Sequence, residues 1–359
     1  MNSELKQYLK LTRSSIIFWS FAMFCYVIFR YLGLEGEMIV GETSVPTQQI
    51  RFTTLALISL LIGAIMGVFY ATIEFYFEKS ISKRLSLGTA LILENTVAFI
   101  STIIIFTISQ TIISDIFNIE ISRERFWWVK DHSFWSLIVY IGLASFVSSF
   151  LKIASERFGP GVFIKILLGR YKKPLEEKRI FMFLDLKGST SIAEQLGHFK
   201  HSQFIQDCFF DLNGVVMKYN AEIYQYVGDE AVLSWPYQKG INNNNCIEVF
   251  FAFQNKIEEK KDYYLKTYGI VPEFKSGVHG GTLMATEIGY IKKELAYHGD
   301  VINTASRIQG KCNLYQVNIL LSESLMQDLN IVNPLDLQVV DNVILKGKKQ
   351  PIKVFTIQT

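Results

Sequence analysis

Two aspartates are placed where a divalent cation could be held. Asp185 follows a short apolar run, 179–184 (RIFMFL), and Asp229 lies in an acidic turn, GDE, within the β-rich segment 222–235. A carboxylate at the end of a buried strand and one on a hairpin turn can converge if the strands are neighbours. Carboxylate oxygens suit Mg²⁺ or Mn²⁺, which keep coordination sites open for phosphate. For the turn taken alone, a solvated loop is the alternative interpretation.

A turn between a strand and a helix could hold the phosphate itself. Gly188, Ser189 and Thr190 follow the first strand, and the next residues carry the pattern of a helix-capping box, Ser191-x-x-Glu194. Backbone N–H groups at a helix N-terminus point toward a bound anion. The segment therefore predicts a phosphate cradle.

Three further polar residues could act on phosphate oxygens. Asn303 and Arg307 are four residues apart in the segment 300–307 (DVINTASR), so they share one face of a predicted helix. An Arg beside an amide can bind phosphate oxygens or stabilise charge on a phosphoryl group. Lys346 lies in a glycine-centred segment, LKGKK, which alone predicts a surface turn.

The elements that position these residues lie in the second half of the chain. The 359 residues are 50% hydrophobic and 19% charged, and the apolar excess is concentrated before Ser155. Four stretches there, 14–32, 52–77, 87–113 and 132–153, reach the length of about 20 helical residues that a bilayer requires. We therefore predict a four-helix transmembrane domain at 1–155, a juxtamembrane linker at 156–178 and a catalytic domain at 179–359.

The distribution of Lys and Arg predicts the orientation. Basic residues cluster before the first span, between the second and third, and after the fourth, whereas the other two loops are acidic or mixed. By the positive-inside rule, both termini and the catalytic domain face the cytoplasm from the inner (plasma) membrane. The net charge of +3 is too small to indicate a nucleic-acid partner. Four cysteines without CxxC spacing indicate neither a disulfide framework nor a zinc site.

Polar and small residues interrupt the predicted spans. Glu94 would lie near the middle of the bilayer, where an ionisable side chain is a candidate membrane sensor. A protonated, hydrogen-bonded Glu94 is the alternative. Gly63 and Gly67 form a GxxxG pattern that favours close helix contact. Glu74 lies near the end of a span, where its carboxylate could extend to the membrane surface without a functional role.

Taken in order, these segments resemble the catalytic domain of the class III nucleotide cyclases, and membrane-anchored bacterial members in particular. The resemblance rests on FLDLKGSTSIAE, YQYVGDEAVLSW, KSGVHGGTL and AYHGDVINTASRI. It covers about half of the chain and implies a ferredoxin-like α/β domain that forms a homodimer, with active sites at the subunit interface.

The resemblance also implies roles for the residues. Asp185 and Asp229, with the Leu186 carbonyl, would bind two Mg²⁺ or Mn²⁺ ions, and Asn303 and Arg307 would come from the opposite protomer to position the ribose and stabilise the phosphorus centre. The residues that would face the triphosphate are Gly188, Ser189, Thr190 and Lys346. The implied reaction is attack of the ribose 3′-hydroxyl on the α-phosphorus, with release of pyrophosphate.

Two positions depart from the family pattern for base recognition. Gln225 stands where adenylate cyclases usually have Lys, and Ala296 where they have Asp or Thr; guanylate cyclases usually have Glu and Cys. Gln225 can both donate and accept a hydrogen bond, whereas Ala296 offers none. ATP is the favoured substrate, and GTP or a pyrimidine nucleotide are alternatives.

Other functions fit the sequence less well. A diguanylate cyclase also carries a GGDEF-like hairpin, but Val227 replaces its first glycine and that family does not use the Asn303/Arg307 helix. A catalytically inactive, nucleotide-binding membrane receptor is a second alternative, disfavoured because the Asp, Asn and Arg residues are all present. A transporter would leave the cytoplasmic domain unexplained.

Overall fold

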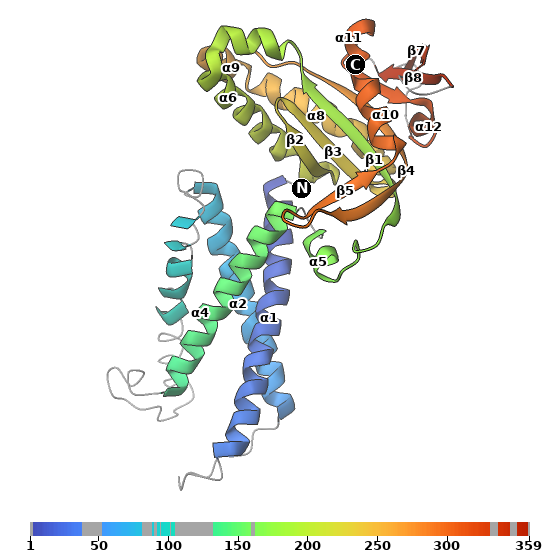
Figure 1. Ribbon diagram of the computed structural model, residues 1–359. Helices are drawn as coiled ribbons and strands as arrows, with labels where there is room; N and C mark the ends of the chain where they lie inside the picture. The colour runs from blue at the N-terminus through green and yellow to red at the C-terminus, as the bar shows by residue number, and fades with distance from the viewer. Residues whose placement is uncertain are drawn as a thin grey trace. The chain divides into compact units, whose positions relative to one another are not determined.

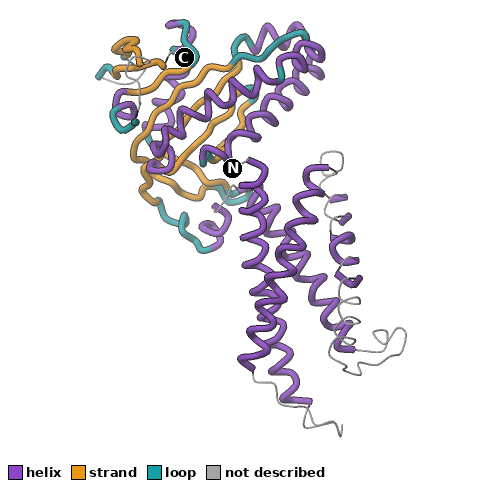
Figure 2. Tube along the Cα trace, turned by 180° about the vertical axis from the view of Figure 1, so that it is seen from behind, coloured by secondary structure: helices purple, strands orange, loops and turns teal. Residues whose placement is uncertain are grey.

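The computed structural model describes residues 3–37, 52–80, 132–158, 162–330, 337–344 and 350–357, with short helical stretches between 88 and 104. The chain divides into two compact units, Met1–Ala154 and Ser155–Thr359. The described part of the first unit is helical, whereas the second unit contains a sheet with helices packed on it (Figures 1 and 2).

Three helices of the first unit are long and apolar enough to cross a membrane. They are α1 (Ser3–Glu37), α2 (Phe52–Ser80) and α4 (His132–Phe158). Their apolar segments have mean hydropathies of 1.6, 2.3 and 1.9 and correspond to the first, second and fourth predicted spans. The third predicted span is described only in part, so a four-helix bundle stays a prediction.

Glycines of α2 allow close contact with α1. A Cβ atom on Gly63 would lie 2.4 Å from Ser20 Cα, and one on Gly67 would lie 2.5 Å from Ile16 Cα. Only glycine permits so close an approach of two backbones. Ser20 Oγ also donates a hydrogen bond to Leu60 O at 3.2 Å. The close helix contact predicted from GxxxG is confirmed.

Polar side chains of the first unit pair with one another. Lys152 Nζ lies 2.8 Å from Glu74 Oε1, and Asn95 Nδ2 donates to Ser149 Oγ at 2.9 Å. Such pairing offsets the cost of placing polar groups among apolar helices. Glu74 therefore forms an ion pair instead of extending alone to the membrane surface. Glu94 lies outside the described residues.

One eight-stranded sheet forms the framework of the second unit. The strand order is β2-β3-β1-β4-β6-β8-β7, with β5 paired to β4. The strands are β1 (Leu175–Leu186), β2 (Glu222–Val227), β3 (Glu230–Pro236), β4 (Phe274–Ile288), β5 (Glu294–His298), β6 (Ile319–Ser322), β7 (Leu337–Val343) and β8 (Ile352–Ile357). β4 and β6 are parallel, and the other pairs are antiparallel.

The order of elements gives the expected α+β topology. The helices are α5 (Val162–Leu167), α6 (Ser189–Val216), α7 (Tyr237–Ile241), α8 (Asn245–Glu259), α9 (Lys261–Tyr268), α10 (Asp300–Gln309), α11 (Cys312–Tyr315) and α12 (Glu323–Met326). The succession β1-α6-β2-β3-α8-β4 with the spatial order β2-β3-β1-β4 is the ferredoxin-like arrangement.

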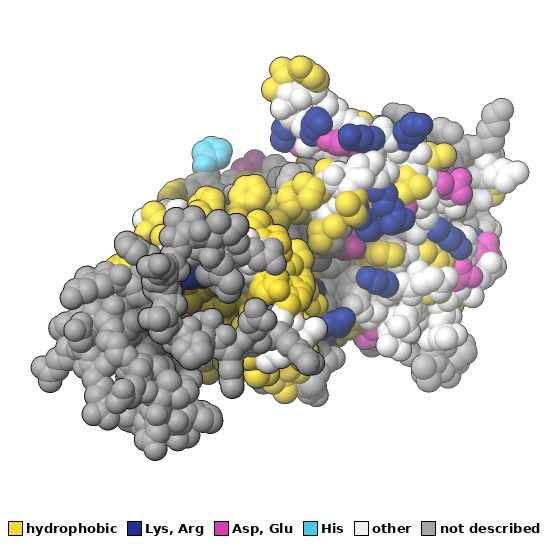
Figure 3. Space-filling model, turned by 90° about the horizontal axis from the view of Figure 1, so that it is seen from below, with side chains coloured by type: hydrophobic (Ala, Val, Ile, Leu, Met, Phe, Trp, Pro, Cys, Tyr) yellow, Lys and Arg dark blue, Asp and Glu magenta, His cyan; other side chains and the backbone are white. Residues whose placement is uncertain are grey.

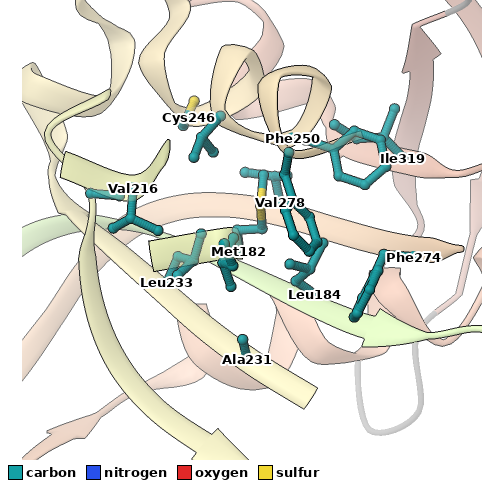
Figure 4. Packing of buried hydrophobic residues seen from close by; sticks show 14 of the residues in the cluster. Met182, Leu184, Val216, Ala231, Leu233, Cys246, Phe250, Phe274, Val278 and Ile319 are labelled. Atoms are coloured by element: carbon teal, nitrogen blue, oxygen red, sulfur yellow. The ribbon is translucent and has the colours of Figure 1, made fainter. Parts of the chain in front are cut away.

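The central strand β1 is buried on both faces of the sheet. Ile180, Met182 and Leu184 contribute to the larger core, which includes residues of α6 and α8 (Figure 4). Phe181 points to the opposite face and packs in a second cluster with Tyr297. A continuous apolar run is expected of a strand covered on both sides. The prediction of a buried strand ending near Asp185 is confirmed.

Candidate active site

Asp185 and Asp229 lie at one end of adjacent strands. Asp185 is the penultimate residue of β1, and its Cα pairs with that of Glu230, the first residue of β3. Asp229 directly precedes Glu230 in the turn between β2 and β3. Gly228 begins that turn with φ 63°, a conformation that glycine adopts readily. The predicted hairpin with an acidic tip is confirmed, and its pairing with β1 brings the two aspartates together.

A third carboxylate, Glu230, completes this acidic cluster. Burial raises the pKa of Glu230 to about 7, and the negative charges of Asp185 and Asp229 contribute to the shift, whereas Lys275 opposes it. Carboxylates that raise one another's pKa are stabilised in their charged form by a nearby positive charge. The charge at this end of the sheet therefore favours a bound cation.

Asp185 is held by two side chains from other elements. Lys275 Nζ lies 3.0 Å from Asp185 Oδ2, and Gln309 Nε2 donates to the same oxygen at 2.9 Å. Lys275 is on β4, directly opposite Asp185 in the strand pairing. Gln309 is the last residue of α10, which packs against β4 at Gly277, where a Cβ atom would lie 2.2 Å from Gln309 N. Only glycine leaves room for the helix to reach Asp185.

The phosphate cradle predicted after β1 is the N-terminus of α6. Gly188 is the N-cap residue, with φ 65° and no side-chain cap. Ser189 and Thr190 begin the helix, and the first intrahelical bond runs from Ile192 N to Gly188 O at 3.0 Å. The preceding backbone N–H groups have no partner within the helix, which suits an anion. The predicted capping box is wrong, because Ser191 already lies inside the helix.

Asn303 and Arg307 share a face of α10 that points away from the carboxylates. Asn303 is exposed and Arg307 is partly exposed, and neither forms a hydrogen bond or ion pair with any described residue. Gln309, two positions after Arg307, is buried and contacts Asp185. Two helical positions correspond to a rotation of about 200°. The face of Arg307 is therefore turned away from the carboxylates of its own chain.

The two positions considered for base recognition flank a hollow of about 560 Å³. Gln225 lies at an irregularity in the pairing of β2 with β3 and lines the hollow. Ala296 is on β5 between two lining residues, Leu295 and Tyr297, and does not itself line the hollow. The structure thus places one of the two residues at a ligand-sized space. Lys346 lies outside the described residues.

Comparison with known proteins decides the family. A sequence model described as the Adenylate and Guanylate cyclase catalytic domain matches residues 171–359, more than half of the chain. The chain belongs to this family. Within it, "Adenylate cyclase 2" of Rhizobium meliloti (strain 1021) is 34% identical over 222 residues, which are 62% of this chain and 61% of the relative. This relative is a bacterial adenylate cyclase by name.

One further relative and one solved structure are also similar to the chain. "Adenylate cyclase" of Anabaena cylindrica is 25% identical over 215 residues, covering 56% of this chain and 42% of that protein. The chain thus spans less than two thirds of the length of both relatives. A solved bacterial light-regulated adenylyl cyclase superposes with a TM-score of 0.52 at 15% identity, covering 62% of this chain and 65% of that one. At this identity the likeness concerns the fold alone.

The second unit, Ser155–Thr359, is called the cyclase unit below. It offers ligands that fit the divalent metals of its family. Asp185 and Asp229 supply carboxylate oxygens, the ligand type that Mg²⁺ prefers, and among the described residues no three His, Cys, Asp or Glu side chains are grouped so that they could hold a metal ion. Burial is the main cause of the raised pKa of Glu230, and the negative charges of Asp185 and Asp229 add to it. Two aspartates leave open positions at a metal for phosphate oxygens. The donor set therefore fits the two ions predicted from the resemblance.

Three residues at the site of the cyclase unit were missed by the sequence analysis as functional candidates. Glu230 was visible as the last residue of the GDE turn and was given no role. Lys275 and Gln309 carried no local signal, because they reach Asp185 only through the pairing of β1 with β4 and the packing of α10. Strand pairing across about ninety residues is not readable from local pattern.

Proposed function

We propose that the chain is a membrane-bound adenylate cyclase that converts ATP to 3′,5′-cyclic AMP and pyrophosphate. The proposal is carried by one observation: Asp185 and Asp229 converge at the end of β1, whereas Arg307 is turned away from them on α10. A complete site therefore needs α10 of a second chain. This requirement supports a homodimer with active sites shared between protomers.

In this proposal each residue of the chain has a defined task. Asp185, Asp229 and the Leu186 carbonyl hold the divalent cations, and the N–H groups at Gly188–Thr190 bind the triphosphate. When bound, the two cations lower the pKa of the ribose 3′-hydroxyl and neutralise the leaving phosphates. Lys346 adds positive charge at the phosphates.

The reaction itself is an in-line displacement. The bond from ribose O3′ to the α-phosphorus forms while the bond from that phosphorus to the bridging oxygen breaks. The hydroxyl proton passes to solvent and pyrophosphate leaves. Arg307 of the second protomer stabilises the charge that grows on the equatorial oxygens, and Asn303 holds the ribose so that O3′ faces the phosphorus.

ATP is the proposed substrate because the first two relatives are named adenylate cyclases. Gln225 lines the hollow, and its amide can both donate to and accept from the edge of adenine. Ala296 provides no hydrogen bond, so discrimination against guanine would rest on Gln225 alone.

The membrane unit anchors this activity. The three helices α1, α2 and α4 are long and apolar enough to span a bilayer, and the Lys and Arg distribution favours a cytoplasmic cyclase unit. Nucleoside triphosphates are found on that side. Confining the chains to a membrane would also favour pairing of the two cyclase units.

The test is a product assay on the full-length protein in detergent or nanodiscs. Purified protein is incubated with ATP, GTP, CTP or UTP and Mn²⁺, and the products are separated by chromatography. We expect cyclic AMP from ATP and none after Asp229→Ala. Cyclic GMP or a cyclic pyrimidine nucleotide as the main product would change the substrate, and no product from any nucleotide would support the inactive receptor instead.

A further inference from the structure

The loop between β4 and β5 exposes two large apolar side chains. Tyr290 is 94% and Ile291 is 99% exposed. No other large hydrophobic side chain among the described residues of either unit is as exposed. Lys292 and Lys293 follow directly, and each forms an ion pair within the hairpin, Lys292 with Glu294 and Lys293 with Glu287. An apolar pair next to two lysines at a hairpin tip indicates a surface that contacts something.

The tip is held in a defined shape. Gly289 has φ 87°, and a Cβ atom on it would lie 2.1 Å from Lys292 O. The strands on either side pair as far as Ile288 and Glu294. Only glycine fits the first position of this turn, so the turn presents Tyr290 and Ile291 on a fixed support.

The segment that follows the last membrane helix packs beside this hairpin. Glu287 N donates to Tyr171 O at 2.9 Å, and Val162 lines the same hollow as Lys292 and Lys293. Both contacts lie within the cyclase unit. The β4–β5 hairpin is therefore adjacent to residues 162–171.

That segment has the same mixture of apolar and basic side chains. Ile164, Leu167 and Leu168 are 57%, 71% and 79% exposed. The same segment is basic, and its basic residues are Lys165, Arg170, Lys172 and Lys173. Figure 3 shows Lys and Arg side chains beside hydrophobic ones, with some Asp and Glu side chains among them, on one face of the cyclase unit. Residues 162–173 and the hairpin tip, residues 289–293, together form an apolar and basic surface, which we call the tip surface.

Chain length limits the distance between the end of α4 and the segment 162–173. The apolar segment of α4 ends at Ser155, α4 itself ends at Phe158, and α5 begins at Val162. An extended chain covers at most about 3.6 Å per residue, so the start of α5 lies within about 15 Å of the end of α4. The start of α5 is therefore close to the end of α4, and the hairpin packs beside the segment that begins there.

We propose that the tip surface binds the anionic lipid surface of the membrane, with Tyr290 and Ile291 inserted among the headgroups. Tyr is enriched at membrane interfaces, where its ring is apolar and its hydroxyl is hydrated. Lysines near the surface attract anionic lipids. A second copy of the chain is the other candidate occupant, but lysine is depleted in protein–protein interfaces. The proposal rests on membrane insertion of α1, α2 and α4, and not on the cyclase activity.

A site-specific fluorophore tests the proposal in the full-length chain. Cys25 is replaced by Ser, because the other three cysteines are buried, and Ile291→Cys is labelled with an environment-sensitive dye. The protein is placed in phosphatidylcholine nanodiscs with or without phosphatidylglycerol, and lipids carrying spin labels serve as quenchers. Leu314→Cys is the matched control, since Leu314 is 67% exposed on α11, which packs at the opposite end of β4.

We expect lipid quenching at position 291 to be at least about threefold stronger than at position 314, and stronger still with the anionic lipid. Equal quenching at the two positions would overturn the proposal. A dye at 291 that is shielded from water but not quenched by lipid would also overturn it, in favour of a second chain. Failure of membrane insertion would be visible separately, as protein that does not elute with the nanodiscs.

Discussion

Arg307 is a residue whose removal should affect turnover without affecting folding. Arg307 is partly exposed, and its guanidinium forms no hydrogen bond or ion pair with any described residue, so no such interaction is lost when the side chain is truncated. If it stabilises charge in the reaction, Arg307→Ala should lower kcat by about 10²-fold or more. Steady-state kinetics give kcat, and thermal unfolding gives the stability. A lowered unfolding temperature together with a small kinetic effect would contradict the proposed role.

Glu230 should make the metal-free protein less stable as the pH rises. Its pKa is about 7 in the folded chain, above the ordinary value of 4.5, so the folded state holds this proton more tightly than the unfolded state. The stabilisation is complete below about pH 4.5 and is lost as the pH rises through 7. In EDTA, Glu230→Gln should therefore gain stability relative to the natural chain between pH 5 and pH 8. A constant difference between the unfolding temperatures of Glu230→Gln and the natural chain across this range would refute the expectation.

At the scale of elements, the contact between α10 and β4 decides where the polar residues of α10 lie. Gly277→Ala would place a Cβ atom 2.2 Å from Gln309 N, which forces the helix away and should destabilise the cyclase unit by about 1–3 kcal/mol. Gly214→Ala is the control, because a Cβ atom there meets nothing within 4 Å and should stabilise α6 by about 0.5–1 kcal/mol. Thermal unfolding of both variants compares the two. If Gly277→Ala unfolds at the same temperature as the natural chain, α10 can shift at little cost in stability.

The elements also explain which parts of the site could be predicted from the sequence. Asp185 and Asp229 were found because their strand and hairpin have local signatures: an apolar run and a glycine-containing turn. The capping box failed because Gly188 in the left-handed conformation caps α6 three residues earlier than Ser191-x-x-Glu194 would. Lys275 could not be found, since its contact with Asp185 depends on the register between two strands far apart in sequence.

At the scale of the whole molecule, the arrangement of residues in one chain implies that a complete site needs a second chain. The carboxylates of the cyclase unit lie at one end of β1 and β3, whereas the free face of α10 is turned away from them. A twofold axis would bring α10 of each protomer to the carboxylates of the other, and both sites would then be completed at once. The site is thus a property of the pair, and each half can be disabled separately.

This leads to a test by mixing two inactive variants. Asp185→Asn removes the metal-binding half and Arg307→Ala the phosphate-stabilising half, so each variant alone should be nearly inactive. If the two variants pair at random, half of the dimers contain one chain of each variant. In such a dimer, one of the two sites keeps both its aspartates and the Arg307 of the other chain. Co-expression should therefore restore about one quarter of the natural activity. Asp185→Asn mixed with Asp229→Ala is the control and should stay inactive, because both changes affect the same half. No recovery in the first mixture would mean that each chain builds its site alone.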